Sequence, residues 1–335
     1  MGVRREETVP PQSVQEYRQI LSMIVQFSFM IDRRLRVLKV LATAGTVTAT
    51  ARALQYTPSA VSAQLRTLSE QLGVTLVVPD GRRLQLTAAG RALVARLDDL
   101  YELWERIEGE VKSATGEISD SLRMGGFSTA AAALLPTVAA NLRAAHPLAT
   151  IQIIEANPAE CFEMLAVDQI DLAVVIATWG IPPMTDGRFE QHSLMDDPLD
   201  LLLPRRHPLA QRESVALREA AREHWITDHD GSAYHRLLLT ACAAAGFVPD
   251  VRHRCVEWES TAALVDAEFG CALVPRMARL PDGYDLARVP LIGEPQPARN
   301  SLTATRRGGA HLPLVAAALR ELESLAERGS ASSRV

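Results

Sequence analysis

The sequence predicts an α plus α/β protein with a small N-terminal helical domain, one long helix and a larger α/β domain of two lobes. Short helical patterns and a hairpin pattern occupy the first 90 residues, and an apolar heptad pattern follows. From Leu122 onward, continuous apolar runs alternate with amphipathic helices, which is typical of α/β domains. At 335 residues the chain is long enough for two or three domains. Hydrophobic content of 47% and charged content of 22% indicate a soluble globular protein.

Residues 57–73 carry the most informative helical pattern. Thr57 can cap the first free amides of a helix, Pro58 suits its first position, and Gly73 suits the left-handed turn that ends it. Apolar residues at steps of four and three predict a buried stripe: Val61, Leu65, Leu68 and Leu72. The opposite face is small and polar and ends in an arginine: Ser59, Ser62, Ala63 and Arg66. Such a face fits a DNA major groove, although an ordinary helix with a solvated face is the alternative.

The neighbouring segments favour the DNA-binding alternative. A shorter helical pattern precedes this helix, and two β-favouring runs, 74–78 and 84–86, follow it around the turn 79–82. This order predicts a winged helix-turn-helix with Arg82 and Arg83 at the tip of the wing. Residues 32–91 contain nine Lys or Arg and three acids, a net charge of +6, whereas the whole chain carries −5. A basic module on an acidic body indicates a nucleic-acid partner for that module. We expect eight residues to contact DNA: Thr57, Pro58, Ser59, Ser62, Ala63, Arg66, Arg82 and Arg83.

These motifs resemble the LysR-type transcriptional regulators, and the resemblance extends to about residue 325. The residues that carry it are 46–51, Leu54, 57–62, Leu65, Leu68, 72–73, Leu76, Arg82 and 86–90. Four positions depart from the family pattern: Val47 and Val77 replace phenylalanine, Pro79 replaces arginine, and Ser69 replaces glutamate. The loss of an arginine at Pro79 removes one expected phosphate contact, so the wing depends on Arg82 and Arg83.

The resemblance implies four segments along the chain. They are an N-terminal extension at 1–29, a winged helix-turn-helix domain at 30–88, a linker helix and hinge at 89–117, and an effector-binding domain at 118–328. Lobe 1 of that domain is expected at about 118–194 plus 291–328, and lobe 2 at 195–290. The apolar run 20–31 is too short to span a bilayer and precedes no cleavage site, so we expect no membrane segment. Residues 1–29 are expected to be disordered or non-native, with Met30 as the natural start.

A heptad pattern follows the wing. Thr87 can cap a helix that runs to about Lys112, with apolar residues at steps of four and three: Leu93, Leu97, Leu100, Trp104, Ile107 and Val111. Acids and arginines fill most other positions, which favours a two-helix seam over packing on the helix's own domain. In the resembling family this linker helix forms the dimer, so we expect a homodimer or tetramer through residues 89–112.

The predicted strands place four stretches where ligands bind in open α/β sheets, after strands and before helices. The resemblance to the family's effector domain, which has the architecture of periplasmic solute-binding proteins, implies that Ser128 and Thr129 hold an effector carboxylate. Ser128 and Ser232 alternatively cap helices. The full set of candidate effector-binding residues is Ser128, Thr129, Thr178, Trp179, Asp230, Ser232 and Glu259.

No pattern in the sequence predicts catalysis, a metal site or a cofactor. His229 and its neighbouring acids lack a nucleophile motif, and the four cysteines form no C-x-x-C pair. Cysteines spaced in this way fit the reducing cytoplasm. The expected partners are therefore double-stranded DNA, a small-molecule effector and a second copy of the chain, with RNA polymerase as a further candidate. The alternatives are a solute-binding or enzymatic α/β protein with an N-terminal oligomerisation module, and a regulator without a small effector.

Overall fold

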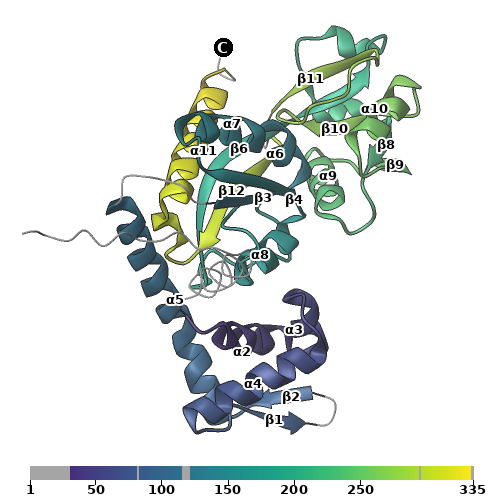
Figure 1. Ribbon diagram of the computed structural model, residues 1–335. Coiled ribbons are helices and arrows are strands. Elements are labelled where there is room, and N and C mark those ends of the chain that lie inside the picture. Colours follow the sequence, from purple (N-terminus) through teal and green to yellow (C-terminus); the bar gives the residue numbers. More distant parts are fainter. Residues whose placement is uncertain (1–30, 81–82, 115–120, 294–295, 333–335) are drawn as a thin grey trace, which may run out of the picture. The chain divides into compact units, whose positions relative to one another are not determined.

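The computed structural model describes residues 31–80, 83–114, 121–293 and 296–332. The predicted extension at 1–29 and Arg82 lie outside these ranges. The chain forms two compact units, residues 1–97 and 98–335, and each is described by itself below (Figure 1).

The first unit is the predicted winged helix-turn-helix. Its elements are α2 (Arg33–Ala44), α3 (Val47–Ala53), α4 (Pro58–Leu72), β1 (Val77–Asp80), β2 (Arg83–Leu86) and the start of α5 (Ala88–Ala114). Strands β1 and β2 pair antiparallel as the wing. The three short helices surround one core: Val37, Leu38, Leu41, Ala51, Val61, Leu65, Leu68 and Leu76.

Helix α4 begins and ends as the sequence predicts. Thr57 Oγ1 accepts a hydrogen bond from the backbone N–H of Ala60 at 3.2 Å, and Gly73 takes the left-handed conformation at φ 66°. The predicted buried stripe is wrong at its last position, because Leu72 is 49% exposed. Leu72 is the final residue of α4, where the chain turns away at Gly73, and the buried stripe therefore ends at Leu68.

Helix α5 divides its heptad residues between two environments. Thr87 Oγ1 caps its first turn by accepting from the backbone N–H of Gly90 at 3.0 Å. Leu93 packs against the core of the first unit, and Leu97 is fully buried. Farther along, Leu100, Ile107 and Val111 are exposed. The N-terminal part of the predicted seam therefore packs within the unit, whereas the remainder stays accessible.

Lobe 1 of the second unit is built on a mixed sheet. Its strands are β4 (Thr150–Glu155), β3 (Ser121–Gly126), β5 (Leu172–Ile176), β12 (Ala298–Arg306) and β6 (Phe189–Pro204), in that spatial order. Strands β3, β4 and β5 are parallel, as predicted, but β12 is antiparallel to both β5 and β6. The alternation of apolar runs with helices from Leu122 onward predicts a parallel sheet, and β12 is an exception to that prediction. The strand that returns to lobe 1 near the end of the chain enters from the opposite direction.

Helices cover both faces of the lobe 1 sheet. They are α6 (Ser128–Ala133), α7 (Leu135–Ala145), α8 (Pro158–Ala166) and α11 (Pro313–Ser332). Helices α7 and α11 lie side by side on one face and share its core with Met124 and Val174 (Figure 1). Helix α8 packs on the other face, where Phe162 meets Phe189 edge to face at 5.0 Å.

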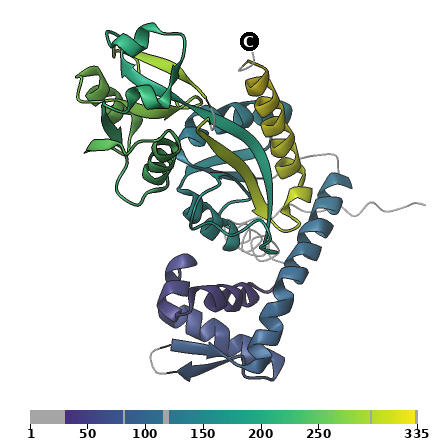
Figure 2. The same ribbon diagram turned by 180° about the vertical axis from the view of Figure 1, so that it is seen from behind.

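Strand β6 connects the two lobes. Its first half pairs with β12 along residues 189–198, and its second half pairs with β10 (Ala272–Pro275) and β11 (Leu286–Ile292) (Figure 2). Lobe 2 also contains β7 (Val215–Ala216), β8 (His224–Thr227), β9 (Asp250–Arg254), α9 (Ala233–Ala244) and α10 (Trp258–Asp266). Trp225 is fully buried at its centre.

Several elements of lobe 2 differ from the sequence prediction. The sequence pattern of residues 214–221 predicts a helix, whereas this segment forms the short strand β7 and the 3₁₀ turn η2 (Leu217–Ala220). The apolar run at 199–203 predicts a strand that begins at Leu199, but β6 begins ten residues earlier. The sequence pattern did not predict β8 or β11. Charged residues such as Asp196 in β6 and Arg288 in β11 interrupt the apolar pattern of these strands. In the fold, such residues are paired with distant segments, which a local pattern does not reveal. Asp200 of β6, for example, pairs with Arg276 at 2.8 Å.

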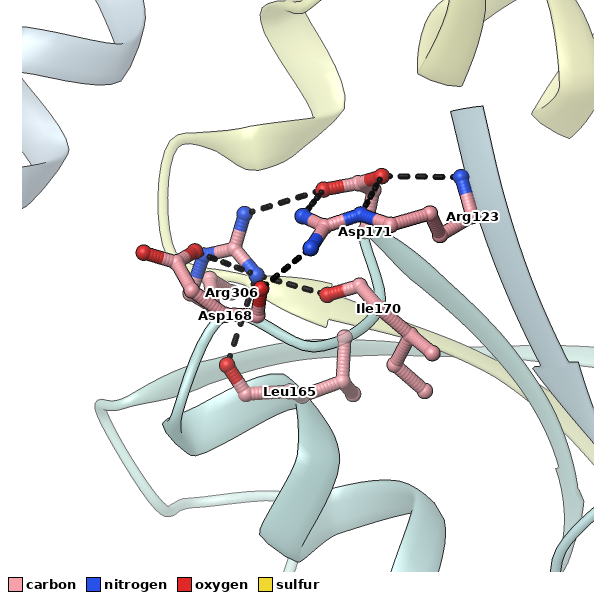
Figure 3. Close-up of polar contacts among 6 residues, drawn as sticks. All are labelled: Arg123, Leu165, Asp168, Ile170, Asp171 and Arg306. Atoms are coloured by element: carbon pink, nitrogen blue, oxygen red, sulfur yellow. Dashed lines mark hydrogen bonds and ion pairs between the residues drawn. The ribbon is translucent and has the colours of Figure 1, made fainter. Parts of the chain in front are cut away.

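A cluster of two arginines and two aspartates links neighbouring strands of lobe 1 at one end of the sheet (Figure 3). Asp171 Oδ2 accepts from the backbone N–H of Arg123 at 2.8 Å, and its Oδ1 lies 2.6 Å from Nη2 of the same arginine. Arg306 pairs with Asp168 at 2.9 Å and donates to the carbonyl of Ile170 at 2.7 Å. Because Arg123 lies on β3 and Arg306 on β12, the cluster joins both strands to the loop before β5.

Candidate DNA-binding helix and effector site

The predicted DNA-contacting residues of α4 lie on one side of the helix, away from the core. Ser59, Ala63 and Arg66 are exposed, and Ser62 is half-buried with its hydroxyl donating to the carbonyl of Pro58 at 3.0 Å. The hydroxyl groups of Thr57 and Ser59 are hydrogen-bonded to each other at 3.0 Å at the start of the helix. This side presents small polar groups and one guanidinium, while Val61, Leu65 and Leu68 hold the helix to the unit.

The wing is tied to α4 by Ser69. Its Oγ donates to the carbonyl of Leu65 at 3.0 Å and accepts from the backbone N–H of Leu76 at 3.4 Å. The serine that departs from the family pattern thus makes a local contact between helix and wing. Arg83 is the first residue of β2, opposite Asp80 of β1. Arg52, which the sequence analysis did not propose as a contact, is also exposed, at the last turn of α3.

The two predicted carboxylate-binding residues lie at the start of α6. Ser128 is exposed, and Phe127 occupies the cap position without a side-chain cap bond. Ser128 therefore does not cap this helix. Thr129 is 3% exposed, and its Oγ1 has no hydrogen-bond partner among the described residues.

The remaining candidates lie in different surroundings. Thr178 is half-buried just after β5, and Trp179 is 87% exposed. Ser232 caps α9 by accepting from the backbone N–H of His235 at 3.0 Å. Asp230 is exposed and pairs with Arg254 at 2.9 Å. Glu259 is exposed in the first turn of α10.

Three buried polar residues on β6 and β12 were not identified from the sequence. Arg299 of β12 and Asp197 of β6 form an ion pair at 2.7 Å, and both are buried. Asp197 also accepts from the backbone N–H of Met277 at 2.9 Å. Ser301 of β12 carries a buried hydroxyl without a partner among the described residues. Long-range pairing of β12 with β6 creates this group, so no local pattern could have predicted it.

The cysteine side chains are poorly suited to thiolate chemistry. Burial raises the pKa of Cys161 and of Cys242 to about 12, and it raises the pKa of Cys271 well above its usual value. Burial also raises the pKa of Cys255, which is half-buried. All four thiols are therefore protonated at neutral pH.

The described residues offer neither a metal cluster nor a membrane span. Within these ranges, no three His, Cys, Asp or Glu side chains gather closely enough to hold a metal ion. Each described helix is also too short or too polar to cross a bilayer.

Two family models match the chain. One is described as the bacterial regulatory helix-turn-helix protein of the lysR family and matches residues 33–91. The other is described as the LysR substrate binding domain and matches residues 115–326. The first covers the winged helix-turn-helix, and the second covers both lobes of the second unit.

Curated relatives are also regulators. The chain is 27% identical over 238 residues to the HTH-type transcriptional regulator AlsR of Bacillus subtilis, which covers 68% of this chain and 75% of AlsR. It is 28% identical over 228 residues to a hydrogen peroxide-inducible genes activator of Dickeya chrysanthemi, covering 67% of this chain and 73% of that protein.

Solved structures share the fold. A full-length single-residue variant of OxyR from Pseudomonas aeruginosa superposes with a TM-score of 0.60 at 18% identity, covering 86% of this chain and 93% of that one. CbnR, a LysR family transcriptional regulator, superposes with a TM-score of 0.52 at 21% identity, covering 88% of this chain and all of that one. With both domain models matched in order, the chain belongs to the LysR family of DNA-binding transcriptional regulators.

Proposed function

We propose that the exposed side of α4 reads operator DNA in the major groove. The observation that supports this proposal most strongly is that α4 has two different faces. One face is apolar and packs in the core, and the other is polar, is not covered by the core and ends in Arg66. Ser59, Ser62 and Ala63 allow close approach to base edges, and Arg66 reaches bases or phosphates. Thr57, Pro58, Arg82 and Arg83 contact the backbone on either side.

The proposed dimer uses the exposed heptad residues of α5. Leu100, Ile107 and Val111 are exposed apolar residues that recur at heptad spacing, as residues at the seam of two paired helices do. A second copy would cover them and place two α4 helices on two half-sites. A tetramer and a contact with RNA polymerase are further assemblies that this dimer would permit.

The proposed effector site lies in the α/β domain, near the start of α6 and the crossing strands β6 and β12. Thr129 supports this position because its buried hydroxyl lacks a partner among the described residues. Ser128, Thr178, Trp179, Asp230, Ser232 and Glu259 remain the other proposed contacts. A bound effector would change the relative placement of the DNA-binding domains, and no catalytic step is proposed for the site.

Peroxide is not the proposed effector, although one relative is named for its response to it. A peroxide sensor needs an accessible thiolate, and the three most buried cysteines here have strongly raised pKa values. The regulator would act in the cytoplasm, where DNA and metabolites are both present.

Gel retardation with DNA from upstream of the protein's own gene tests the function. Binding should weaken by about tenfold or more between 50 and 200 mM salt, because several phosphate contacts release counterions. Absence of retardation at 50 mM salt would contradict the proposal. As a second arm, Ser128→Ala should retain DNA binding and lose most of the effector response.

A further inference from the structure

The second half of α5 contacts lobe 1 at the corner between β12 and the 3₁₀ turn η3 (Gly309–His311). Glu102 Oε2 lies 2.8 Å from Nε of Arg307, the residue that directly follows β12. Both residues belong to the second compact unit, which begins at Asp98. This ion pair therefore holds a helix to the end of a strand that lies far away in the sequence.

The backbones of the two segments also approach each other closely. Gly308 adopts the left-handed conformation at φ 82°, and a Cβ on it would meet the backbone oxygen of Glu102 at 2.9 Å and its Cα at 3.1 Å. Both the conformation and the close approach favour glycine at this position. The contact thus has a defined shape in addition to its pair of charges.

The corner that receives Glu102 is anchored to the lobe 1 sheet. The backbone N–H of Gly308 donates to Oε1 of Glu190 in β6 at 3.0 Å. The backbone N–H of Arg307 donates to the carbonyl of Arg188 at 3.0 Å. Because β6 and β12 are paired along this end of the sheet, the corner is a fixed point of lobe 1.

Glu102 has a second partner on its own helix. Its Oε1 accepts a hydrogen bond from Nη2 of Arg106, one turn along α5, at 3.2 Å. The Glu102 side chain is 22% exposed and the Arg307 side chain is 45% exposed. Ion pairs at such positions contribute little net stability and are weakened by salt. If α5 separates from lobe 1, Glu102 keeps Arg106 and Arg307 is hydrated, so neither charge is left buried without a partner.

The lobe 1 contact leaves the proposed dimer seam accessible. By the helical period, Glu102 lies on the side of α5 opposite to Leu100, Ile107 and Val111. These three residues are exposed. A second copy of the chain could therefore cover them while Glu102 still contacts its own lobe 1.

We propose that Glu102 is a positioning residue, which holds the second half of α5 on lobe 1 through a reversible contact with Arg307 and Gly308. The contact acts in addition to the covalent connection between α5 and β3. Its opening would leave that connection alone to fix the helix to the lobe. The inference goes beyond the proposed function, because the contact requires neither DNA nor an effector.

Hydrogen exchange of the full chain, followed in peptides from residues 98–114, tests the contact. Arg307→Glu places a second negative charge opposite Glu102 and should accelerate exchange in these peptides by about threefold or more at 50 mM salt. The sequence of α5 is unchanged in this variant, so its intrinsic helix propensity cannot explain the effect. Arg205→Glu is the matched control, because Arg205 forms an exposed pair with Asp285 in lobe 2. It should leave exchange in α5 as in the wild type.

Rescue and salt dependence distinguish an electrostatic contact from packing alone. The double variant Glu102→Arg, Arg307→Glu restores opposite charges and should recover most of the wild-type protection. Raising the salt from 50 to 500 mM should accelerate exchange in the wild type and change Arg307→Glu little, because salt screens exposed charges.

Gly308→Ala tests the close approach of the two backbones. It should accelerate exchange in residues 98–114, because its methyl group meets the Glu102 backbone. Gly246→Ala is the control for backbone strain: Gly246 has a similar φ of 87°, and nothing lies within 4 Å of a Cβ there. This control should leave exchange in α5 unchanged.

Two results would overturn the inference: Arg307→Glu exchanges as slowly as the wild type in residues 98–114, or the double variant exchanges as fast as Arg307→Glu. Gel retardation with upstream DNA is run in parallel on the same preparations. A wild type that fails to bind DNA refutes the proposed function, whereas unchanged exchange in Arg307→Glu refutes only the contact between Glu102 and lobe 1.

Discussion

Gly90 lies so close to Leu76 that a Cβ on Gly90 would meet the Leu76 carbonyl oxygen at 2.2 Å. The first turn of α5 therefore packs directly on the backbone that leads into the wing. Thr87 strengthens this contact by donating from its hydroxyl to the carbonyl of Thr75 at 2.7 Å. The first turn of the long helix and the segment that leads into the wing are thus in direct contact within the DNA-binding unit.

Gly90→Ala should destabilise the DNA-binding unit. The added methyl group must displace backbone, which costs about 1–3 kcal/mol. Hydrogen exchange of residues 33–91 should become faster, and DNA affinity should fall at elevated temperature. Gly187→Ala is the control, because nothing lies within 4 Å of a Cβ there. Unchanged hydrogen exchange in Gly90→Ala would show that the contact between α5 and Leu76 accommodates the methyl group without loss of stability.

Asp171→Ala should destabilise the α/β domain much more than Asp285→Ala. Asp171 is nearly buried and pairs with Arg123 and Arg306, so its removal leaves the Arg123 guanidinium without its carboxylate partner and costs about 3 kcal/mol. Asp285 forms an exposed pair with Arg205, a kind of pair worth about 0–1 kcal/mol. Calorimetry should show a melting temperature about 6–12 °C lower for Asp171→Ala. Equal effects of the two changes would mean that the Figure 3 cluster adds little stability.

The exposed heptad residues of α5 should control assembly. Changing Leu100 and Ile107 together to aspartate places charges in the proposed seam and should convert the dimer to a monomer in sedimentation experiments. Affinity for DNA with two half-sites should fall, while affinity for a single half-site should change little.

Ala95→Asp provides the matched control for this change. Ala95 is exposed on the opposite side of α5 by the helical period, so it should leave the dimer intact. A double aspartate variant that remains dimeric would place the interface elsewhere.

The buried thiols should be unreactive in the folded protein. At pH 8, a disulfide reagent should modify Cys255 at most, and all four thiols should react after unfolding in guanidinium. Rapid reaction of a second thiol in the native protein would contradict the burial described here and would reopen thiol-based sensing.

The same thiols should make stability fall in alkali. The folded-state pKa values of Cys161 and Cys242 are about 12, above the ordinary value of 9.0, so the folded state holds more protons between these limits. The contribution of these two thiols to the free energy of unfolding is complete below pH 9. It is lost as the pH rises, at up to about 1.4 kcal/mol per thiol per pH unit. The double alanine variant should lose less stability than the wild type between pH 8 and pH 10. Equal losses would assign the alkaline effect to other groups.

The DNA-binding unit could be predicted almost completely from the sequence, because its determinants are local. Thr57 and Gly73 mark the ends of α4 within 16 residues of each other, and the apolar period identifies the buried face. The prediction failed at Leu72, whose exposure depends on where the following chain goes. The identity of the DNA contacts stays a prediction.

The proposed effector site was less predictable, because residues far apart in sequence would form it. Thr129 was proposed through the family resemblance. The buried pair of Arg299 and Asp197, in contrast, is created by the pairing of β12 with β6, about 100 residues apart in sequence. A lone arginine in a strand carries no local sign that it will be buried against a distant aspartate. Asp230 was predicted from its position in a loop before a helix, and its ion pair with Arg254 likewise depends on a distant strand.

Fluorescence anisotropy of labelled upstream DNA, titrated with wild type and Arg66→Ala at several salt concentrations, tests the central claim most directly. If the polar side of α4 enters the groove, Arg66→Ala should weaken binding by about tenfold or more, and the salt dependence should fall by about one phosphate contact if Arg66 meets the backbone. Gln211→Ala, in the α/β domain, should bind as the wild type does. Identical affinity of Arg66→Ala and wild type at every salt concentration would contradict the assignment of α4 as the DNA-reading helix.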